Sequence, residues 1–329
     1  MLVLCSDDVR RCLPMAEAIE GMKEAMAAVS DGRLEMPDRS HLDVPAHRGV
    51  VLTMPSFSHG SGGDSLAIKV VSLFDGNADR GLARIQATVL VLEPATGVAA
   101  ALLHGATLTA IRTGAASGAA ADLLARKDAR AVAIFGAGVQ GMTQLEAVCT
   151  VRDIEEVFVY DLDTARAEEF AVEVAGTGPI PSNVCVAGSP KEALADADIV
   201  CAATVSHSPI FDDADVRPGT HISAVGSYQP HVQELPAETV VRSRLVVDMR
   251  QMALIEPGDI MIPIAKGMMT PDDIHAELGE IVLGRKPGRE NDEQITLFKS
   301  VGLAVQDAIA ARIALEHARE LGLGQQITW

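Results

Sequence analysis

The first clear pattern along the chain is an apolar periodicity that predicts an amphipathic α-helix after residue 14. Apolar residues recur at every third or fourth position, as they do on one face of a helix: Met15, Ile19, Met22, Met26 and Val29. Pro14 suits the first turn of this helix, and the pattern ends near Gly32. A methionine-rich face of this kind is typical of a packed core.

From about residue 48 to residue 103 the pattern is that of β-strands. Four apolar runs rich in β-branched and aliphatic residues are typical of strands: 50–55, 65–74, 83–93 and 98–105. The segment Glu93–Gly97, between the last two runs, predicts a hairpin turn. We therefore expect an antiparallel or mixed sheet, whose apolar face or exposed edge is a candidate dimer surface.

A helix of small residues is expected over about 109–125, and after it short strands alternate with helices. The expected strands are apolar and β-rich: 131–135, 156–160, 198–204, 221–226 and 244–248. This alternation predicts an α/β fold with a doubly wound parallel sheet. After about residue 303 a helical pattern returns, and we expect this last helix to fold back on the first part of the chain.

Composition and charge narrow the functional classes. The chain has 329 residues, of which 48% are apolar, and its 27 Lys and Arg against 45 Asp and Glu give a net charge of −18. The length predicts two domains, and the charge argues against binding to nucleic acid or to an anionic membrane surface. Five widely spaced cysteines, an acidic start unlike a signal peptide, and no apolar run of about 18 residues favour a cytoplasmic protein.

A glycine-rich loop predicts dinucleotide binding. Six residues that fit G-x-G-x-x-G directly follow the expected strand 131–135 and open a helix: Gly136, Ala137, Gly138, Val139, Gln140 and Gly141. Gly136 allows a tight turn, Gly138 lets the backbone approach a pyrophosphate, and Gly141 lets the helix pack closely on the strand. The N-terminus of that helix offers N–H groups to the phosphate oxygens.

The residue after the next expected strand bears on the choice of cofactor. Asp161 lies 20 residues after Gly141, where a carboxylate accepts hydrogen bonds from the adenosine ribose hydroxyls. A carboxylate there would repel a 2′-phosphate, so NAD(H) is the preferred cofactor. Arg166 is close enough in sequence to keep NADP(H) possible.

Two cations interrupt apolar segments in the first part of the chain. Lys69 lies in the expected strand 65–74, and Arg112 lies in the small-residue helix. Each could reach solvent or pair with a structural acid. Alternatively, the guanidinium binds a substrate carboxylate and the ammonium lies beside the reacting centre. Arg39 could bind the carboxylate as well, although a lone loop arginine is usually a surface residue. The nine histidines are scattered, and we expect no metal site.

At this point the chain resembles the ornithine cyclodeaminase/mu-crystallin family. The similar blocks cover essentially the whole chain in order: LAIKVVSLF, GLARIQATVLVLEPATG, LTAIRTGAASG, FGAGVQGMTQLEA, RPGTHISAVGSYQP with Glu234-Leu235, and ITLFKSVG. The resemblance implies a Rossmann domain (119–303) inserted into an α+β substrate-binding and dimerisation domain (1–118 and 304–329). It also implies a nicotinamide cofactor, an amino or imino acid ligand and a homodimer.

The resemblance further implies roles for individual residues. Arg39, Lys69 and Arg112 would contact the substrate. Four residues would lie near the cofactor, most of them near its nicotinamide: Thr204, Val225, Gly226 and Ser300.

Two departures from the ornithine cyclodeaminases point to another substrate. Those enzymes carry an acidic residue where this chain has Tyr228, and a glutamate before the Met-Pro pair where it has Leu52. Without these acids, a cationic side-chain amine lacks counter-charge. The sequence thus resembles the branch that reduces cyclic ketimines such as Δ1-pyrroline-2-carboxylate or Δ1-piperideine-2-carboxylate to proline or pipecolate.

In that interpretation Arg112 and Arg39 fix the carboxylate, and Lys69 hydrogen-bonds the substrate and assists protonation. Tyr228 either relays a proton or packs over the substrate ring. Three alternatives stay open: an ornithine cyclodeaminase, an alanine-type amino-acid dehydrogenase, and a ligand-binding protein with little turnover.

Overall fold

The computed structural model describes residues 1–60 and 62–328. Ser61, and Trp329 at the end of the predicted first domain, lie outside the described residues. The chain separates into two compact units, which we call unit 1 (Met1–Arg112 with the residues from Leu303 onward) and unit 2 (Thr113–Gly302). The first division falls inside helix α3 (Gly105–Leu124), where the sequence has no loop to mark it.

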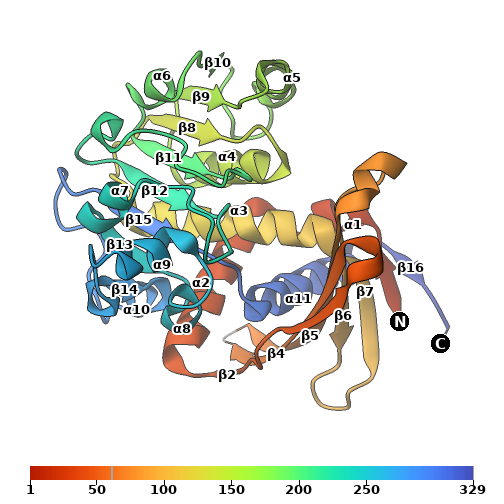
Figure 1. Ribbon diagram of the computed structural model, residues 1–329. Coiled ribbons are helices and arrows are strands. Elements are labelled where there is room, and N and C mark those ends of the chain that lie inside the picture. Colours follow the sequence, from red (N-terminus) through yellow and green to blue (C-terminus); the bar gives the residue numbers. More distant parts are fainter. Residues whose placement is uncertain (61, 329) are drawn as a thin grey trace. The chain divides into compact units, whose positions relative to one another are not determined.

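Unit 1 is built on a mixed sheet whose strands run in the order β16-β1-β7-β6-β5-β4-β2, with β3 paired to β4 (Figure 1). The strands are β1 (Leu2–Leu4), β2 (Leu34–Glu35), β3 (Ser40–Val44), β4 (Gly49–Gly60), β5 (Gly63–Phe74), β6 (Ile85–Leu92), β7 (Ala99–His104) and β16 (Gln325–Gln326). Only the β1–β7 pair is parallel among these described strands. The predicted hairpin turn joins β6 to β7, with the Glu93 N–H donating to the Val98 carbonyl at 2.8 Å.

Three helices of unit 1 pack against one face of this sheet and against one another: α1 (Ser6–Cys12), α2 (Met15–Asp31) and α11 (Ala304–Leu321) (Figure 1). The predicted helix after residue 14 is α2; Pro14 is its N-cap instead of lying in the first turn, and Gly32 closes it at φ 65°. Helix α11 packs on α2, β4 and β5, which confirms that the end of the chain returns to the first part.

Unit 2 holds a parallel sheet in the order β10-β9-β8-β11-β12-β15-β13-β14. Its strands are β8 (Ala131–Phe135), β9 (Glu156–Tyr160), β10 (Val184–Val186), β11 (Ile199–Ala202), β12 (His221–Ala224), β13 (Arg244–Val247), β14 (Ala276–Glu277) and β15 (Thr296–Lys299). The chain runs outward from β8 through β9 to β10, then crosses to β11 on the other side of β8. This reversal confirms the doubly wound sheet and creates the crevice in which such folds bind ligands.

Helices cover both faces of the parallel sheet (Figure 1). They are α4 (Val139–Val151), α5 (Thr164–Val174), α6 (Pro190–Leu194), α7 (Ala237–Arg242), α8 (Arg250–Ala253), α9 (Gly258–Ala265) and α10 (Leu278–Val282). One apolar core joins the sheet to α4, α5 and the end of α3, and a second joins it to α6, α7 and α9. Because both faces are buried, the central strands β8 and β11 are apolar along their whole length.

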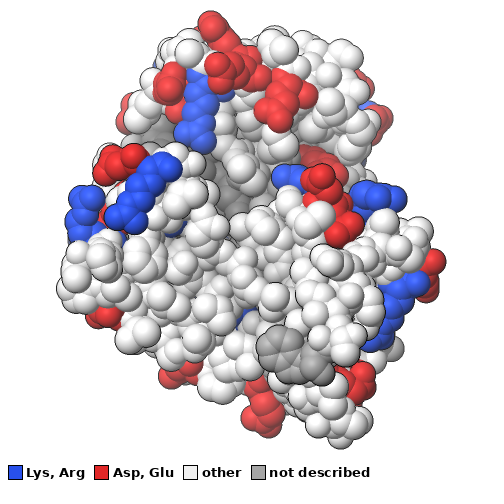
Figure 2. Space-filling model, turned by 90° about the vertical axis from the view of Figure 1, so that its right-hand side faces the viewer, with Lys and Arg blue, Asp and Glu red and all other residues white. Residues whose placement is uncertain are grey.

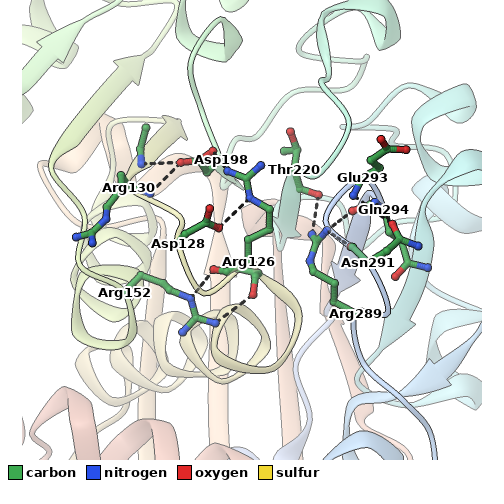
Figure 3. Close-up of polar contacts among 12 residues, drawn as sticks. Arg126, Asp128, Arg130, Arg152, Asp198, Thr220, Arg289, Asn291, Glu293 and Gln294 are labelled. Carbon is green, nitrogen blue, oxygen red and sulfur yellow. Dashed lines mark hydrogen bonds and ion pairs between the residues drawn. The ribbon is translucent and has the colours of Figure 1, made fainter.

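Two arginines bind the C-terminal end of α3 at the amino ends of the strands (Figure 3). Arg152 donates to four main-chain carbonyls at the end of this helix: Ala121, Asp122, Ala125 and Arg126. Arg289 donates through Nε to the Leu124 carbonyl at 2.7 Å and through Nη2 to Thr296 Oγ1 at 3.0 Å. These cations donate to carbonyls at the end of the helix, and their positive charge interacts favourably with the negative end of the helix dipole.

A fully buried histidine lies close to these arginines. The His221 side chain at the start of β12 is 0% exposed and lies within hydrogen-bond distance of Thr296 Oγ1 (3.0 Å) and Ser223 Oγ (3.2 Å). Burial, assisted by the positive charges of Arg289 and Arg152, lowers the pKa of His221 to about 3. The imidazole is therefore neutral in the folded protein over the physiological range.

This neutral histidine predicts acid-sensitive stability. In the unfolded chain His221 is protonated below about pH 6.5, whereas in the folded protein it becomes protonated only below about pH 3. Stability from this residue should therefore be lost as the pH falls, by about 2 kcal/mol between about pH 8 and pH 5.

Urea unfolding of the wild type and of His221→Gln at both pH values measures the effect. The difference between the two free energies of unfolding should change with pH. His231→Gln, at an exposed position, is the control, and an equal pH dependence in wild type and His221→Gln would contradict the prediction.

Candidate functional site

The glycine-rich loop of unit 2 joins β8 to α4 at the carboxyl edge of the parallel sheet. Gly136 has φ 100°, and a Cβ there would lie 2.7 Å from the Ala203 carbonyl oxygen. A Cβ on Gly141 would lie 2.2 Å from the Gly136 carbonyl oxygen. Side chains at these two positions would thus displace the backbone of the turn. Gly138 is the N-cap of α4, so the first N–H groups of this helix, which lack intrahelical acceptors, lie directly after the loop.

Asp161 and Arg166 both hydrogen-bond to this loop. Asp161 follows β9, and its Oδ2 accepts a hydrogen bond from the Ala137 N–H at 2.8 Å. Arg166 Nε donates to the Ala137 carbonyl at 2.9 Å. The main chain of one loop residue, Ala137, is therefore held on both sides, by a carboxylate at its N–H and by a guanidinium at its carbonyl. The helix N-terminus, the close-packed glycines and the carboxylate at the end of β9 together fit the diphosphate and ribose of a dinucleotide.

The other predicted cofactor residues lie at the ends of neighbouring strands of unit 2. Thr204 follows β11, Val225 and Gly226 follow β12, and Ser300 follows β15. Buried carboxylates hold these strand ends. Glu234 accepts from Thr204 and from Gly226, and Asp248 Oδ2 accepts from Ser300 Oγ at 2.8 Å. Nothing in the sequence pattern identified Asp248, because its partners Ser300 and Val301 lie in the segment after β15, more than 50 positions later.

In unit 1, two predicted substrate residues share one buried acid. Asp307 on α11 is paired through Oδ2 with Lys69 Nζ at 2.6 Å and through Oδ1 with Arg112 Nε at 3.0 Å. Their side chains are only 1%, 3% and 6% exposed. Lys69 comes from β5 and Arg112 from α3, so three elements converge on this cluster. We call Lys69, Arg112 and Asp307 the cation pair and its shared carboxylate.

Gln306 completes the surroundings of Arg112. Its Oε1 accepts from Arg112 Nη1 at 2.8 Å and from the Leu303 N–H at 2.8 Å. Its Nε2 is buried and has no hydrogen-bond partner among the described residues. Neither Gln306 nor Asp307 was predicted from the sequence as a site residue. Their signal was an amide and an acid inside the otherwise apolar start of the last helix, as unusual there as Lys69 is in its strand.

The cluster has more positive than negative charge. Two buried cations face one carboxylate, and Arg39 adds a further positive potential at Lys69. Burial lowers the pKa of Lys69 to about 8; Asp307 opposes this shift, whereas Arg112 and Arg39 add to it. An excess of buried positive charge is costly unless an anion joins it. The site therefore favours an anionic ligand.

The structure says less about two other predicted site residues, Arg39 and Tyr228. Arg39 is half-buried and directly precedes β3 of unit 1. Tyr228 belongs to unit 2, in the segment after β12, and is 44% exposed. Their assigned contacts with substrate stay predictions.

Residues 1–60 and 62–328 contain neither a group of metal ligands nor a helix that could span a membrane. In that part of the chain no three His, Cys, Asp or Glu side chains group as ligands for a metal ion. No helix described there combines the length and the apolar character needed to cross a bilayer.

Comparisons with known proteins agree with this geometry. The chain is 39% identical over 328 residues to Δ1-pyrroline-2-carboxylate reductase of Bacillus cereus, covering 99% of each protein. The Thermococcus litoralis Δ1-pyrroline-2-carboxylate reductase, solved in complex with NADH and L-proline, is 44% identical with a TM-score of 0.93 over 99% of this chain and 100% of that one. An archaeal alanine dehydrogenase dimer with bound NAD is 34% identical, with a TM-score of 0.91 over 100% and 99%.

The sequence model of one family matches residues 1–322, nearly the whole chain. The match extends through the glycine-rich loop, both cations and the shared carboxylate. The chain belongs to the ornithine cyclodeaminase/mu-crystallin family.

Proposed function

We propose that this protein reduces a cyclic ketimine carboxylate, Δ1-pyrroline-2-carboxylate or Δ1-piperideine-2-carboxylate, to the cyclic L-amino acid with NADH. The observation that carries the proposal is the cation pair with its single shared carboxylate, which leaves buried positive charge for a substrate carboxylate. The B. cereus and T. litoralis reductases, similar over nearly their whole length, support the reaction.

Unit 2 holds the cofactor in this proposal. When bound, NADH supplies the hydride. The loop Gly136–Gly141 and the first turn of α4 bind its diphosphate, and Asp161 binds the adenosine ribose. The Asp161 carboxylate, next to the position of a 2′-phosphate, disfavours NADPH, whereas Arg166 of α5, which donates to the loop at the Ala137 carbonyl, offers NADPH a cationic partner. The T. litoralis reductase and the alanine dehydrogenase were solved with NADH and NAD, which supports NADH as the cofactor.

Unit 1 binds the imino acid. Arg112, whose guanidinium is held by Asp307 and Gln306, presents a fixed fork to the substrate carboxylate, with Arg39 as a second ligand. Lys69 hydrogen-bonds the substrate and keeps its imine nitrogen protonated, which makes the neighbouring carbon more electrophilic. A pKa of about 8 lets Lys69 carry that proton near neutral pH.

A cyclic substrate that has no second amine fits a pocket in which Tyr228 and Leu52 replace acidic residues. Tyr228 and Leu52 stand where ornithine cyclodeaminases carry acidic groups, so a charged side-chain amine would be bound without counter-charge. Tyr228 then packs over the ring or relays a proton. An alanine dehydrogenase is the second candidate, because the archaeal enzyme is 34% identical and alanine also lacks a second amine.

A substrate panel tests this function. We expect rapid NADH oxidation with Δ1-pyrroline-2-carboxylate or Δ1-piperideine-2-carboxylate, followed by absorbance at about 340 nm, and slower oxidation of NADPH. Faster oxidation with pyruvate and ammonia would favour the alanine dehydrogenase. Release of ammonia from ornithine without net NADH change would indicate a cyclodeaminase, and NADH binding without turnover of any of these compounds would indicate a ligand-binding protein.

The shared carboxylate predicts a shift in the pH profile. Because Lys69 must be protonated, kcat/KM should fall as the pH rises through about 8. Asp307 raises the pKa of Lys69, so Asp307→Asn should move this fall to lower pH. The substrate titrates identically in both assays, so the difference between the profiles reports the lysine. Loss of the buried partner should also cost about 3 kcal/mol of stability.

Glu316→Gln on the same helix is the matched control, since Glu316 contacts Arg312 and is half exposed. It should leave the profile unchanged. An unshifted profile in a folded Asp307→Asn protein would contradict the role of Lys69 as the titrating group.

We also propose that two copies form a dimer through the face of the unit 1 sheet that lies opposite the helices. Ile68, Leu90 and Leu102 pair directly across β5, β6 and β7 and are only half-buried, and Val70 is 41% exposed. Their neighbours Lys69, Val89 and Leu103 face the helices and are at most 3% exposed. In the lower half of Figure 2, the charged side chains lie mostly along the lower and right-hand rim, and the middle is largely uncharged. The dimeric alanine dehydrogenase supports this assembly.

The dimer face predicts a change of mass in solution. Ile68→Lys places a charge in the centre of the apolar face and should convert the dimer to a monomer, measured by sedimentation or light scattering. Val172→Lys, at an apolar residue of α5 that is 83% exposed, is the matched control and should stay dimeric. An unchanged mass for Ile68→Lys would contradict this interface.

We further propose a cytoplasmic location. All five cysteines are free thiols, which agrees with a reducing compartment.

A further inference from the structure

We propose that Glu234 is a positioning residue that shapes the half-site for the nicotinamide by holding the ends of β11 and β12 in register. Glu234 was noted in the sequence only as part of a family block, and its carboxylate is the point where these two strand ends meet. The inference rests on the proposed function, because it concerns binding of NADH.

The contacts of Glu234 connect two adjacent strand ends. Its Oε1 accepts from the Thr204 N–H at 2.6 Å and from Thr204 Oγ1 at 2.7 Å, and its Oε2 accepts from the Gly226 N–H at 2.9 Å. The side chain is 0% exposed. Gly226 leaves the space that the carboxylate fills, since a Cβ there would lie 2.4 and 2.5 Å from the two carboxylate oxygens. One side chain therefore fixes the backbone of both segments.

A second buried carboxylate fixes Glu234 itself. Asp259 Oδ1 accepts from the Glu234 N–H at 2.7 Å and from the Leu235 N–H at 2.9 Å. Asp259 Oδ2 is paired with Lys299 Nζ at 2.9 Å, and both side chains are 1% exposed. Burial raises the pKa of the Glu234 carboxyl, whereas Lys299 and the donors on Thr204 favour its charged form. Only that form accepts all three hydrogen bonds.

The order of the strands connects these contacts to the nicotinamide. The diphosphate loop follows β8, and the ribose-binding Asp161 follows β9, on one side of the point where the strand order reverses. A dinucleotide bound across this crevice extends its adenosine half toward β9 and its other half toward β11 and β12. Thr204 and Gly226 follow these two strands. The side-chain hydrogen bonds of Glu234 thus go to the nicotinamide half, at Thr204 and Gly226, and not to the loop Gly136–Gly141.

The variant Glu234→Gln isolates this role because it keeps the shape of the side chain. The amide has one oxygen and one NH2 group, so in either orientation an NH2 faces a main-chain N–H, that of Gly226 or that of Thr204. One of the two strand ends must then move.

The measurement compares two ligands that share the adenosine diphosphate half. We expect Glu234→Gln to raise the Kd for NADH about tenfold while leaving the Kd for ADP-ribose, which lacks the nicotinamide ring, within about twofold of wild type. Thr204→Val removes one donor to the same oxygen. It should raise the ratio of the Kd for NADH to the Kd for ADP-ribose as well, by a smaller factor. Glu238→Gln, at an exposed acid on α7, should change neither value.

The outcomes separate this inference from the function on which it rests. Equal Kd values for NADH in wild type and in both variants would overturn the role of Glu234. Parallel weakening of NADH and ADP-ribose would also overturn it, because the residue would then support the whole fold of unit 2. A wild-type protein that binds neither ligand would instead refute the proposed cofactor.

Discussion

One carboxylate shared between two buried cations is the interaction on which the unit 1 site depends. Asp307 pairs with both Lys69 and Arg112, so the cluster is held together and yet retains positive charge. A second acid would neutralise the pair and remove the reason to bind a carboxylate, whereas no acid would leave two cations repelling each other in a buried site. The same arrangement explains why Lys69 can titrate near neutral pH: burial lowers its pKa, and the shared carboxylate limits the shift.

Unit 2 uses buried carboxylates for a different purpose. Glu234 and Asp248 accept mainly from main-chain N–H and hydroxyl groups at the ends of strands, and Asp259 holds the segment that carries Glu234. Parallel strands end in loops, whose N–H groups have no partner in the sheet. A carboxylate that accepts several of them satisfies these donors and fixes the loops at once. Buried acids thus build the crevice in unit 2, whereas in unit 1 a buried acid tunes charge.

The sequence predicted the elements whose pattern is local. Strands 131–135 and 156–160 match β8 and β9, because each is a short apolar run bounded by charged or glycine residues. The sequence pattern missed β3, because its exposed side chains do not alternate with buried ones. It also missed β15, where the buried Lys299 has its partner 40 positions away. It singled out Lys69 and Arg112 as unusual cations but left their partner open. Asp307 lies 195 positions from Arg112, and no local pattern expresses a pairing of that length.

Net charge is a poor guide to the ligand of such a protein. The chain carries −18, yet the proposed substrate and cofactor are both anions. Charges on the surface are screened by salt over about 8–10 Å, whereas charges inside are screened much less. The excess of positive charge at Lys69 and Arg112 is buried. The loop Gly136–Gly141 offers N–H dipoles at the N-terminus of α4. Local structure therefore sets the sign of the electrostatic potential at the site where a small anion binds. The net charge still repels polyanions, which are large enough to contact much of the surface.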